Sequence, residues 1–126
     1  MHKKIINTLS APAPIGPYNQ AVKAGKYLFV SGQIAINSVT GQLVTDNIED
    51  ETRQVMQNIE AILVAAEMSW DNIIKTTIFL TDINNFAKIN QVYGSFFQTD
   101  FPARETVEVS RLPKDVNVEI SVVAAE

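Results

Sequence analysis

The feature that most constrains the fold is one amphipathic segment over residues 46–67. Its apolar side chains recur at helical spacing and form a single stripe: Val55, Ile59, Ile62, Leu63 and Ala66. Asp46, followed three residues later by Glu49, predicts a capping box at the start of this helix. A helix with one apolar stripe must bury that stripe against a second layer of structure.

The segments around this helix predict that the second layer is a sheet. Strand-like runs occupy residues 4–6, 18–24, 27–31, 75–80, 104–110 and 116–124. Gly25-Lys26 predicts a tight turn between two of them, and residues 112–115 predict a hairpin joining the last two. Residues 11–17 hold three prolines and cannot form a helix. A second helix is expected over residues 84–98, with this inner face: Phe86, Ile89, Tyr93, Phe96 and Phe97.

This order of elements predicts an α+β fold, with both helices on one face of a mixed sheet. The chain has 126 residues, a usual length for one domain, so we expect a single domain over residues 1–126. Valine or isoleucine occupies both alternating phases of the last strand. We therefore expect another subunit to bury the face of the sheet that the helices leave bare.

Composition narrows the chemistry. The chain has no cysteine, and its one histidine is His2, so thiolate nucleophiles, His-based triads and His/Cys metal clusters are not expected. The formal net charge is −4 and the basic residues are scattered, which argues against nucleic acid as a partner. No apolar run approaches the roughly 18 residues that cross a bilayer. The sequence thus predicts a cytoplasmic protein with no membrane association.

Three polar side chains carry a chemical interpretation. Arg104 begins a strand, and its planar guanidinium can form two parallel hydrogen bonds with a carboxylate. Asn90 falls within an apolar stripe, where a buried amide needs a partner. Glu119 alternates with apolar neighbours and could orient a water molecule. Structural alternatives stay open: a surface salt bridge for Arg104, a backbone-bonded amide for Asn90 and a solvated strand face for Glu119.

The predicted hairpin also places two of these residues. It would pair residue 108 with residue 119, so that Arg104 and Glu119 share one face of the sheet. Four residues along the ladder would still separate them by roughly 13 Å. If both act on one small ligand, the site is expected to lie between subunits.

Four motifs occur together over nearly the whole chain. They are Ile15-Gly16-Pro17-Tyr18, Ser31-Gly32-Gln33, Phe101-Pro102-Ala103-Arg104, and Arg111-Leu112-Pro113-Lys114-Asp115-Val116 followed by Val118-Glu119-Ile120. In this order and spacing they closely resemble the reactive intermediate deaminases of the RidA/YjgF family. The resemblance implies a chorismate-mutase-like α+β fold and a homotrimer with ligand clefts between subunits.

The resemblance also implies an activity. Members hydrolyse reactive enamine and imine acids (2-aminoacrylate, 2-iminopropanoate and 2-iminobutanoate) to 2-oxo acids and ammonia, without metal or cofactor. This implies a functional link to the pyridoxal-phosphate dehydratases that release such compounds. By resemblance, Arg104 holds the substrate carboxylate and Glu119 positions the attacking water. Further positions that match the family cleft are Tyr18, Ser31, the Gly32 backbone and Asn90.

The chain departs from the family pattern just after the arginine. Many relatives carry a small residue and then cysteine there, whereas this chain has Glu105-Thr106. Thr106 is expected to share the face of Arg104 and to donate a hydrogen bond to substrate. Glu105 is expected to point to the other face, where its carboxylate needs a partner. A second interpretation stays open, in which the protein is a non-enzymatic trimer that binds a small carboxylate and regulates a partner.

Overall fold

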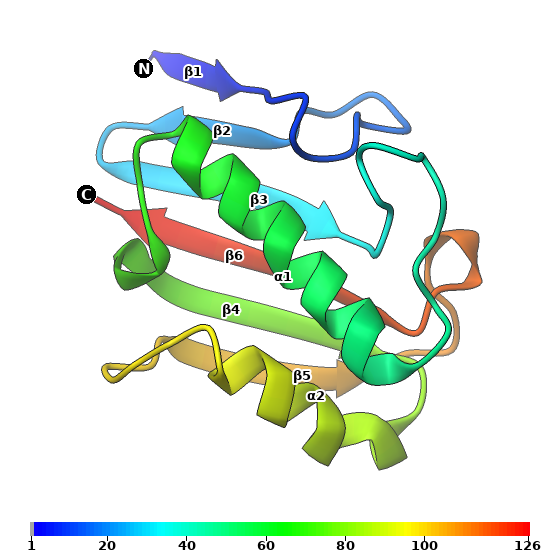
Figure 1. Ribbon diagram of the computed structural model, residues 1–126. Helices are drawn as coiled ribbons and strands as arrows, with labels where there is room; N and C mark the ends of the chain where they lie inside the picture. The colour runs from blue at the N-terminus through cyan, green and yellow to red at the C-terminus, as the bar shows by residue number, and fades with distance from the viewer. Residues whose placement is uncertain (1) are drawn as a thin grey trace.

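A computed structural model describes residues 2–126 and contains one six-stranded mixed sheet in the order β1-β2-β3-β6-β4-β5 (Figure 1). The helices and strands, in chain order, are β1 (Lys3–Ile6), β2 (Ala21–Ala24), β3 (Tyr27–Gln33), α1 (Ile48–Ala65), β4 (Ile73–Leu80), α2 (Phe86–Gly94), β5 (Ala103–Glu108) and β6 (Val118–Ala125). Single 3-10 turns lie at Trp70–Asn72, Ile83–Asn85 and Pro113–Asp115. The predicted α+β class is confirmed.

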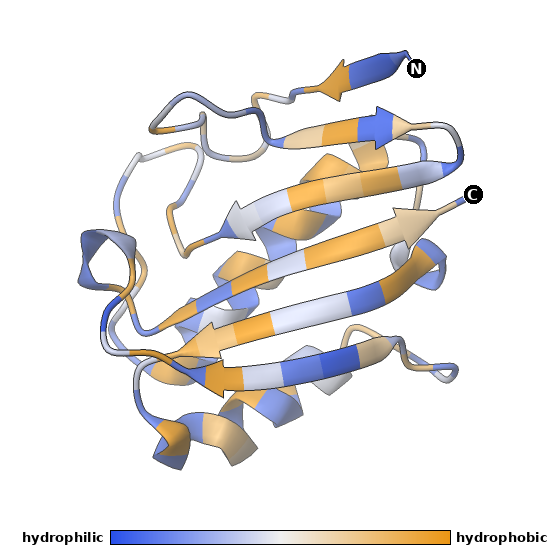
Figure 2. Cartoon of the chain, turned by 180° about the vertical axis from the view of Figure 1, so that it is seen from behind, coloured by the Kyte–Doolittle hydropathy of each residue, from blue (hydrophilic) through white to orange (hydrophobic). Residues whose placement is uncertain are grey.

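Both helices cover the same face of the sheet, as predicted (Figure 1). The predicted stripe of α1 is buried, and it packs against sheet residues such as Leu28, Ile78 and Ile120. Figure 2 shows the opposite face of the sheet, which no helix covers. Exposed apolar side chains on that face include Phe29 and Val107. The helix start differs from the prediction by one residue, because the Asn47 side chain accepts a hydrogen bond from the Asp50 amide, at 2.8 Å.

The predicted hairpin between the last two strands is wrong. β5 pairs with β4 in parallel, whereas β6 lies between β3 and β4 and is antiparallel to both. The reason lies in β6 itself: a strand with apolar residues in both phases is suited to the centre of a sheet, where neighbours on both sides and helices on one face enclose it. Residues 112–115 therefore belong to a crossover connection and not to a tight hairpin.

This topology changes the relation between Arg104 and Glu119. Arg104 pairs with Thr76, whose side chain points to the helices, whereas Glu119 pairs with Phe79 on the helix-free face. The prediction that the two share a face is therefore wrong. Two strand spacings and three residues along the ladder separate their Cα atoms by roughly 14 Å.

The second helix is shorter than predicted. α2 ends at Gly94, and of the predicted inner face Ile89 and Tyr93 are buried, whereas Phe86 is exposed. Phe96 and Phe97 follow the helix and pack against the edge of the core. None of the helices within residues 2–126 has the length and apolarity needed to cross a membrane.

Candidate functional site

Arg104 is held at the seam between β5 and α2. Its Nη1 donates a hydrogen bond to Asn90 Oδ1 at 2.7 Å. The guanidinium carbon lies 5.2 Å from the ring centroid of Tyr93 and 5.7 Å from that of Phe86. Phe86, Asn90 and Tyr93 are spaced four and three residues apart, so all three project from one side of α2. This face of the helix fixes the plane of the guanidinium.

Tyr93 connects this arrangement to the sheet. Its hydroxyl donates a hydrogen bond to Thr76 Oγ1 at 2.9 Å, inside the core. Burial raises the pKa of Tyr93, and the hydrogen bond to Thr76 and the charge of Arg104 oppose that rise. Tyr93 is therefore a neutral phenol at physiological pH, and its ring supports Arg104 without carrying charge. The sequence analysis placed Tyr93 only in the core; its spacing from Asn90 was the pattern that pointed to this second role.

A hollow of about 310 Å³ opens beside Arg104. It is lined by Asn90, Tyr93, Gly94, Phe101, Pro102 and Arg104. Within residues 2–126, no hydrogen bond involves the Nε or Nη2 of Arg104, so these nitrogens can bind an anion in the hollow. Thr106 lies two residues further along the same face of β5, as predicted, but it does not line the hollow. Its Oγ1 is buried and has no hydrogen-bond partner in the described part of the chain.

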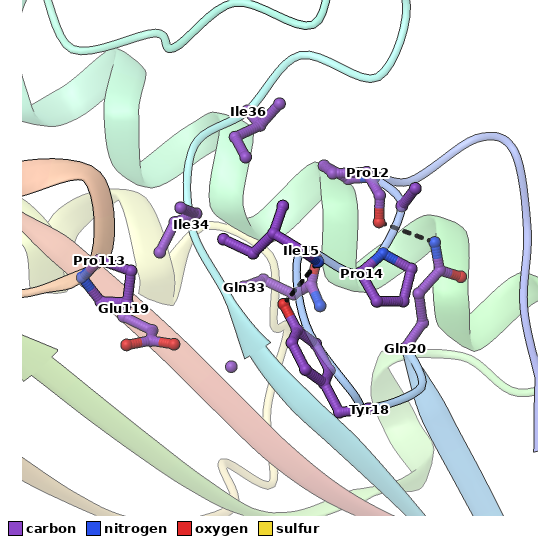
Figure 3. Close-up of a pocket in the computed structure, with 12 residues that line it drawn as sticks. Pro12, Pro14, Ile15, Tyr18, Gln20, Gln33, Ile34, Ile36, Pro113 and Glu119 are labelled. Carbon is purple, nitrogen blue, oxygen red and sulfur yellow. Dashed lines mark hydrogen bonds between the residues drawn. The ribbon is translucent and has the colours of Figure 1, made fainter.

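Glu119 belongs to a second hollow, formed by β3, β6 and the proline-rich loop before β2. Figure 3 shows its carboxylate facing this hollow, on the opposite side from Pro12 and Pro14. The side chain is partly buried, and this burial raises the pKa of the Glu119 carboxyl. A carboxyl with a raised pKa exchanges its proton more readily near neutral pH.

A β-bulge brings the backbone of Gly32 against Glu119. Between Val30 and Gln33, three steps on β3 oppose two steps on β6, so one extra residue is inserted. A Cβ atom at Gly32 would overlap Oε2 of Glu119 and lie only 2.8 Å from its Cδ. The absence of a side chain at Gly32 is therefore what gives the carboxylate its position.

Tyr18 lines the same hollow. Its hydroxyl accepts a hydrogen bond from the Ile15 amide at 3.3 Å, which ties it to the loop of residues 11–17 (Figure 3). The volume of about 40 Å³ is enough for a water molecule and little more. Ser31 lies next to Gly32 on the bulge, and its hydroxyl donates to the Asn19 carbonyl at 2.6 Å instead of pointing into the hollow.

Glu51 supports this second hollow from inside the core, and the sequence analysis missed it. The fully buried carboxylate of Glu51, on α1, accepts hydrogen bonds from the Asn117 amide and side chain, both at 2.7 Å, and from the Val118 amide at 3.3 Å. It thereby anchors the residues that lead into Glu119. An acidic residue one position inside the apolar stripe was the only sequence pattern that pointed to it.

Glu105 lies on the helix-free face, as the sequence predicted. Its carboxylate pairs with Lys75 Nζ at 3.0 Å and accepts a hydrogen bond from the Thr77 hydroxyl. These two partners, Thr77 first, lower the pKa of Glu105. The predicted partner for this carboxylate is thus present within the chain. No group of three or more His, Cys, Asp or Glu side chains in residues 2–126 is arranged to hold a metal ion.

The predicted site residues therefore form two separate groups. Arg104 and Asn90 share the hollow on the side of α2, and Tyr18, Gly32 and Glu119 share the hollow beside the bulge. Ser31 and Thr106 lie next to these groups without lining either hollow. One copy of the chain does not bring Arg104 and Glu119 together.

Comparisons with known proteins agree with the motifs. The family model described as "Endoribonuclease L-PSP" matches residues 8–126. A RutC family protein of Pyrococcus horikoshii is 55% identical over 97% of each chain. The Escherichia coli K12 protein named "Putative reactive intermediate deaminase TdcF" is 49% identical over 97% of this chain and 96% of its own.

Solved structures give the same result. A crystal structure of E. coli TdcF with bound serine has a TM-score of 0.94 at 47% identity and covers 98% of both chains. The YjgF gene product of E. coli has a TM-score of 0.94 at 44% identity, again over 98% of both chains. The chain therefore belongs to the RidA/YjgF family, whose sequence model carries the endoribonuclease L-PSP description.

Proposed function

We propose that this protein is a cytoplasmic deaminase, with residues 1–126 acting as one domain, that hydrolyses reactive enamine and imine acids to 2-oxo acids and ammonia. The substrates are 2-aminoacrylate, 2-iminopropanoate and 2-iminobutanoate, supplied by pyridoxal-phosphate dehydratases. The observation that carries the proposal is the Arg104 guanidinium, oriented by Asn90 and two aromatic rings, with two nitrogens open to a carboxylate. The words "reactive intermediate deaminase" in the name of one relative, and the serine bound to E. coli TdcF, support a small carboxylate ligand.

Arg104 binds the substrate carboxylate in this proposal. A planar guanidinium that offers Nε and Nη2 side by side makes two parallel hydrogen bonds with a carboxylate. The bond from Nη1 to Asn90 leaves these two nitrogens available and restricts their rotation. Binding therefore also orients the imine carbon for attack.

Glu119 handles the proton. Water adds to C2 of the imine, which is electrophilic once its nitrogen is protonated, and Glu119 accepts a proton from that water. The resulting carbinolamine loses ammonia after proton transfer to nitrogen, and the C2 hydroxyl becomes the oxo group. For an enamine, protonation at C3 first gives the imine. The raised pKa of Glu119 suits a carboxyl that both accepts and returns a proton.

The two groups of residues must come from different copies of the chain. Arg104 and Glu119 lie on opposite faces of one sheet, roughly 14 Å apart by strand spacing, so a single copy cannot apply both to one small substrate. A homotrimer, in which the helix-free faces meet and each site joins two neighbours, resolves this separation. It also buries the exposed apolar side chains of that face.

A coupled assay tests the reaction. A dehydratase generates 2-aminoacrylate or 2-iminobutanoate, and release of the 2-oxo acid is timed with and without this protein. We expect the protein to accelerate release and Arg104→Ala to abolish the acceleration, with a loss in affinity of roughly thirty-fold to several-thousand-fold. Arg111→Ala is the matched control, because it removes an equal charge from an exposed pair with Asp115. An Arg104→Ala protein as active as wild type would refute the proposal.

Mixing inactive variants tests the shared site. Arg104→Ala and Glu119→Gln chains are unfolded together and refolded as mixed oligomers. If each site takes Arg104 from one copy and Glu119 from its neighbour, about a quarter of the sites in a random 1:1 mixture combine two intact residues. Activity should then return to about that fraction of wild type. If both residues came from the same copy, the mixture would stay inactive.

The same variants separate catalysis from pure ligand sensing. A non-enzymatic sensor needs Arg104 but has no use for a proton acceptor at Glu119. Glu119→Gln should retain binding of 2-oxo acids while hydrolysis slows. Unchanged hydrolysis in Glu119→Gln, or no acceleration by the wild type, would instead favour the sensor.

A further inference from the structure

We infer that the hollow beside Arg104 is a subsite for the substrate side chain, shaped by Gly94 and Phe101, and that it accepts 2-imino acids with branched aliphatic or aromatic side chains. The inference rests on the proposed function, because it assumes that the carboxylate is bound by Arg104. It adds the class of side chain that the same site accepts. Neither Gly94 nor Phe101 is needed for the proposed binding of the carboxylate or for proton transfer.

The size of the hollow is the first argument. Its volume is about 310 Å³, at the lower end of the range of roughly 300–1,000 Å³ typical of pockets for small organic ligands. The methylene of 2-aminoacrylate or the ethyl group of 2-iminobutanoate would leave most of this space to water. A benzyl or isobutyl group would displace that water and bury additional apolar area.

The chemistry of the walls is the second argument. Apart from Arg104 and Asn90, the lining consists of Tyr93, Gly94, Phe101 and Pro102, which offer rings, a pyrrolidine and backbone. A carboxylate at Arg104 thus has an apolar wall immediately beside it. This combination of one cation with adjacent rings matches an amino-acid-like ligand that has an apolar side chain.

Phe101 is the third argument, because it is exposed yet held in place. Its side chain is 62% exposed, which is unusual for a phenylalanine without a ligand or partner. Its ring centroid lies 5.9 Å from that of Phe97, which in turn lies 5.0 Å from that of Tyr93. These contacts present one face of the Phe101 ring beside the hollow without requiring it to move on binding.

Gly94 is the fourth argument, and it supplies the test. A Cβ atom added at Gly94 would have no atom within 4 Å, so a larger side chain there meets only the hollow. Gly94 has no left-handed backbone conformation that would require glycine. A leucine at this position should therefore reduce the space available to the substrate side chain while the fold is kept.

The experiment measures a specificity ratio. An amino-acid oxidase generates the imines of 2-aminobutanoate, leucine and phenylalanine, and kcat/KM is determined for each by its 2-oxo acid product. We expect wild type to accelerate hydrolysis of all three. We expect Gly94→Leu to lower the ratio of the phenylalanine-derived to the 2-aminobutanoate-derived imine by more than about tenfold, since a few methylenes in an apolar pocket discriminate by about that factor or more. Phe101→Ala should lower the same ratio.

Gln91→Leu is the matched control, because it adds the same side chain to an exposed position of α2 outside the hollow and should leave the ratio unchanged. Wild type that hydrolyses the 2-aminobutanoate-derived imine but neither larger one would overturn the subsite and leave the proposed function intact. An unchanged ratio in both Gly94→Leu and Phe101→Ala would do the same. Failure of wild type with all three imines would refute the proposed function itself, and the subsite with it.

Discussion

Gly32→Ala tests the position of the Glu119 carboxylate with a single methyl group. The new Cβ would lie 2.8 Å from Glu119 Cδ, whereas carbon atoms in contact are usually about 3.5–4.0 Å apart. The carboxylate must therefore retreat by about 1 Å. A displacement of about 1 Å at a reacting group can cost about 100-fold in rate, so we expect kcat for imine hydrolysis to fall by about that factor.

Stability should change little in the same variant. The atoms displaced by the methyl group belong to the end of a flexible side chain, and an off-rotamer side chain costs about 0.5–1.5 kcal/mol. Replacing glycine by alanine in a strand returns about 0.5–1 kcal/mol, and Gly32 has no left-handed conformation that would prevent this gain. The net change in the free energy of unfolding is expected to stay within about 1 kcal/mol.

The decisive assay is a double-mutant cycle. Rates of 2-oxo acid release are measured for Gly32→Ala, Glu119→Ala and the double variant, with chemical denaturation of each protein as the check on folding. If the methyl group acts through Glu119, it should slow the Glu119→Ala protein less than about twofold. A fully active Gly32→Ala protein, or an equal loss in both backgrounds, would refute the reasoning.

Three further predictions concern buried groups. Glu51→Ala leaves the amides of Asn117 and Val118 unpaired and should lower the free energy of unfolding by about 2–6 kcal/mol, whereas Glu51→Gln, which keeps an acceptor, should cost less than half of that in urea denaturation; equal costs would contradict the account. Burial raises the pKa of Glu119, so its stabilising contribution is fully present below the unfolded value near 4.5 and is lost as pH rises through the folded value. Glu119→Gln should accordingly melt higher than wild type at pH 8 and show no such advantage near pH 4, and a pH-independent difference in melting temperature would argue against this. Tyr93→Phe removes the hydroxyl that pairs with Thr76 and should cost about 1 kcal/mol in denaturation while 2-oxo acid affinity, read by calorimetry, stays within about twofold. A large loss of affinity in that variant would mean that the hydroxyl, and not only the ring, supports Arg104.

The sequence predicted local structure better than strand pairing. Helical periodicity and turn residues follow from contacts between near neighbours, so the stripe of α1 and the turn at Gly25 were predicted correctly. The choice between β5 and β4 as neighbours of β6 depends on packing across the whole sheet, and chain proximity favoured the wrong partner. The apolar residues in both phases of β6 were noticed but were attributed to a second subunit instead of to a central position.

The site was predicted as a set of residues but not as an arrangement. The motifs identified Arg104, Asn90 and Glu119, because these side chains recur with a family pattern. The faces on which they lie depend on strand order, which is why the sequence placed Arg104 and Glu119 on the same face. Glu51 escaped notice because a carboxylate bonded only to amide and side-chain N–H groups has no charged partner that a sequence pattern would reveal.

The central place of β6 has a consequence for how the chain acquires its structure. β1, β2 and β3 form one block and β4 and β5 another, and β6 alone joins them in the sheet. During synthesis the ribosome releases both blocks before β6 emerges, so the inner edges of β3 and β4 stay unpaired until residues 118–125 are available. Pairings this distant in sequence slow folding and expose strand edges to aggregation. The nascent chain is therefore expected to depend on chaperones that shield such edges until its final strand is made.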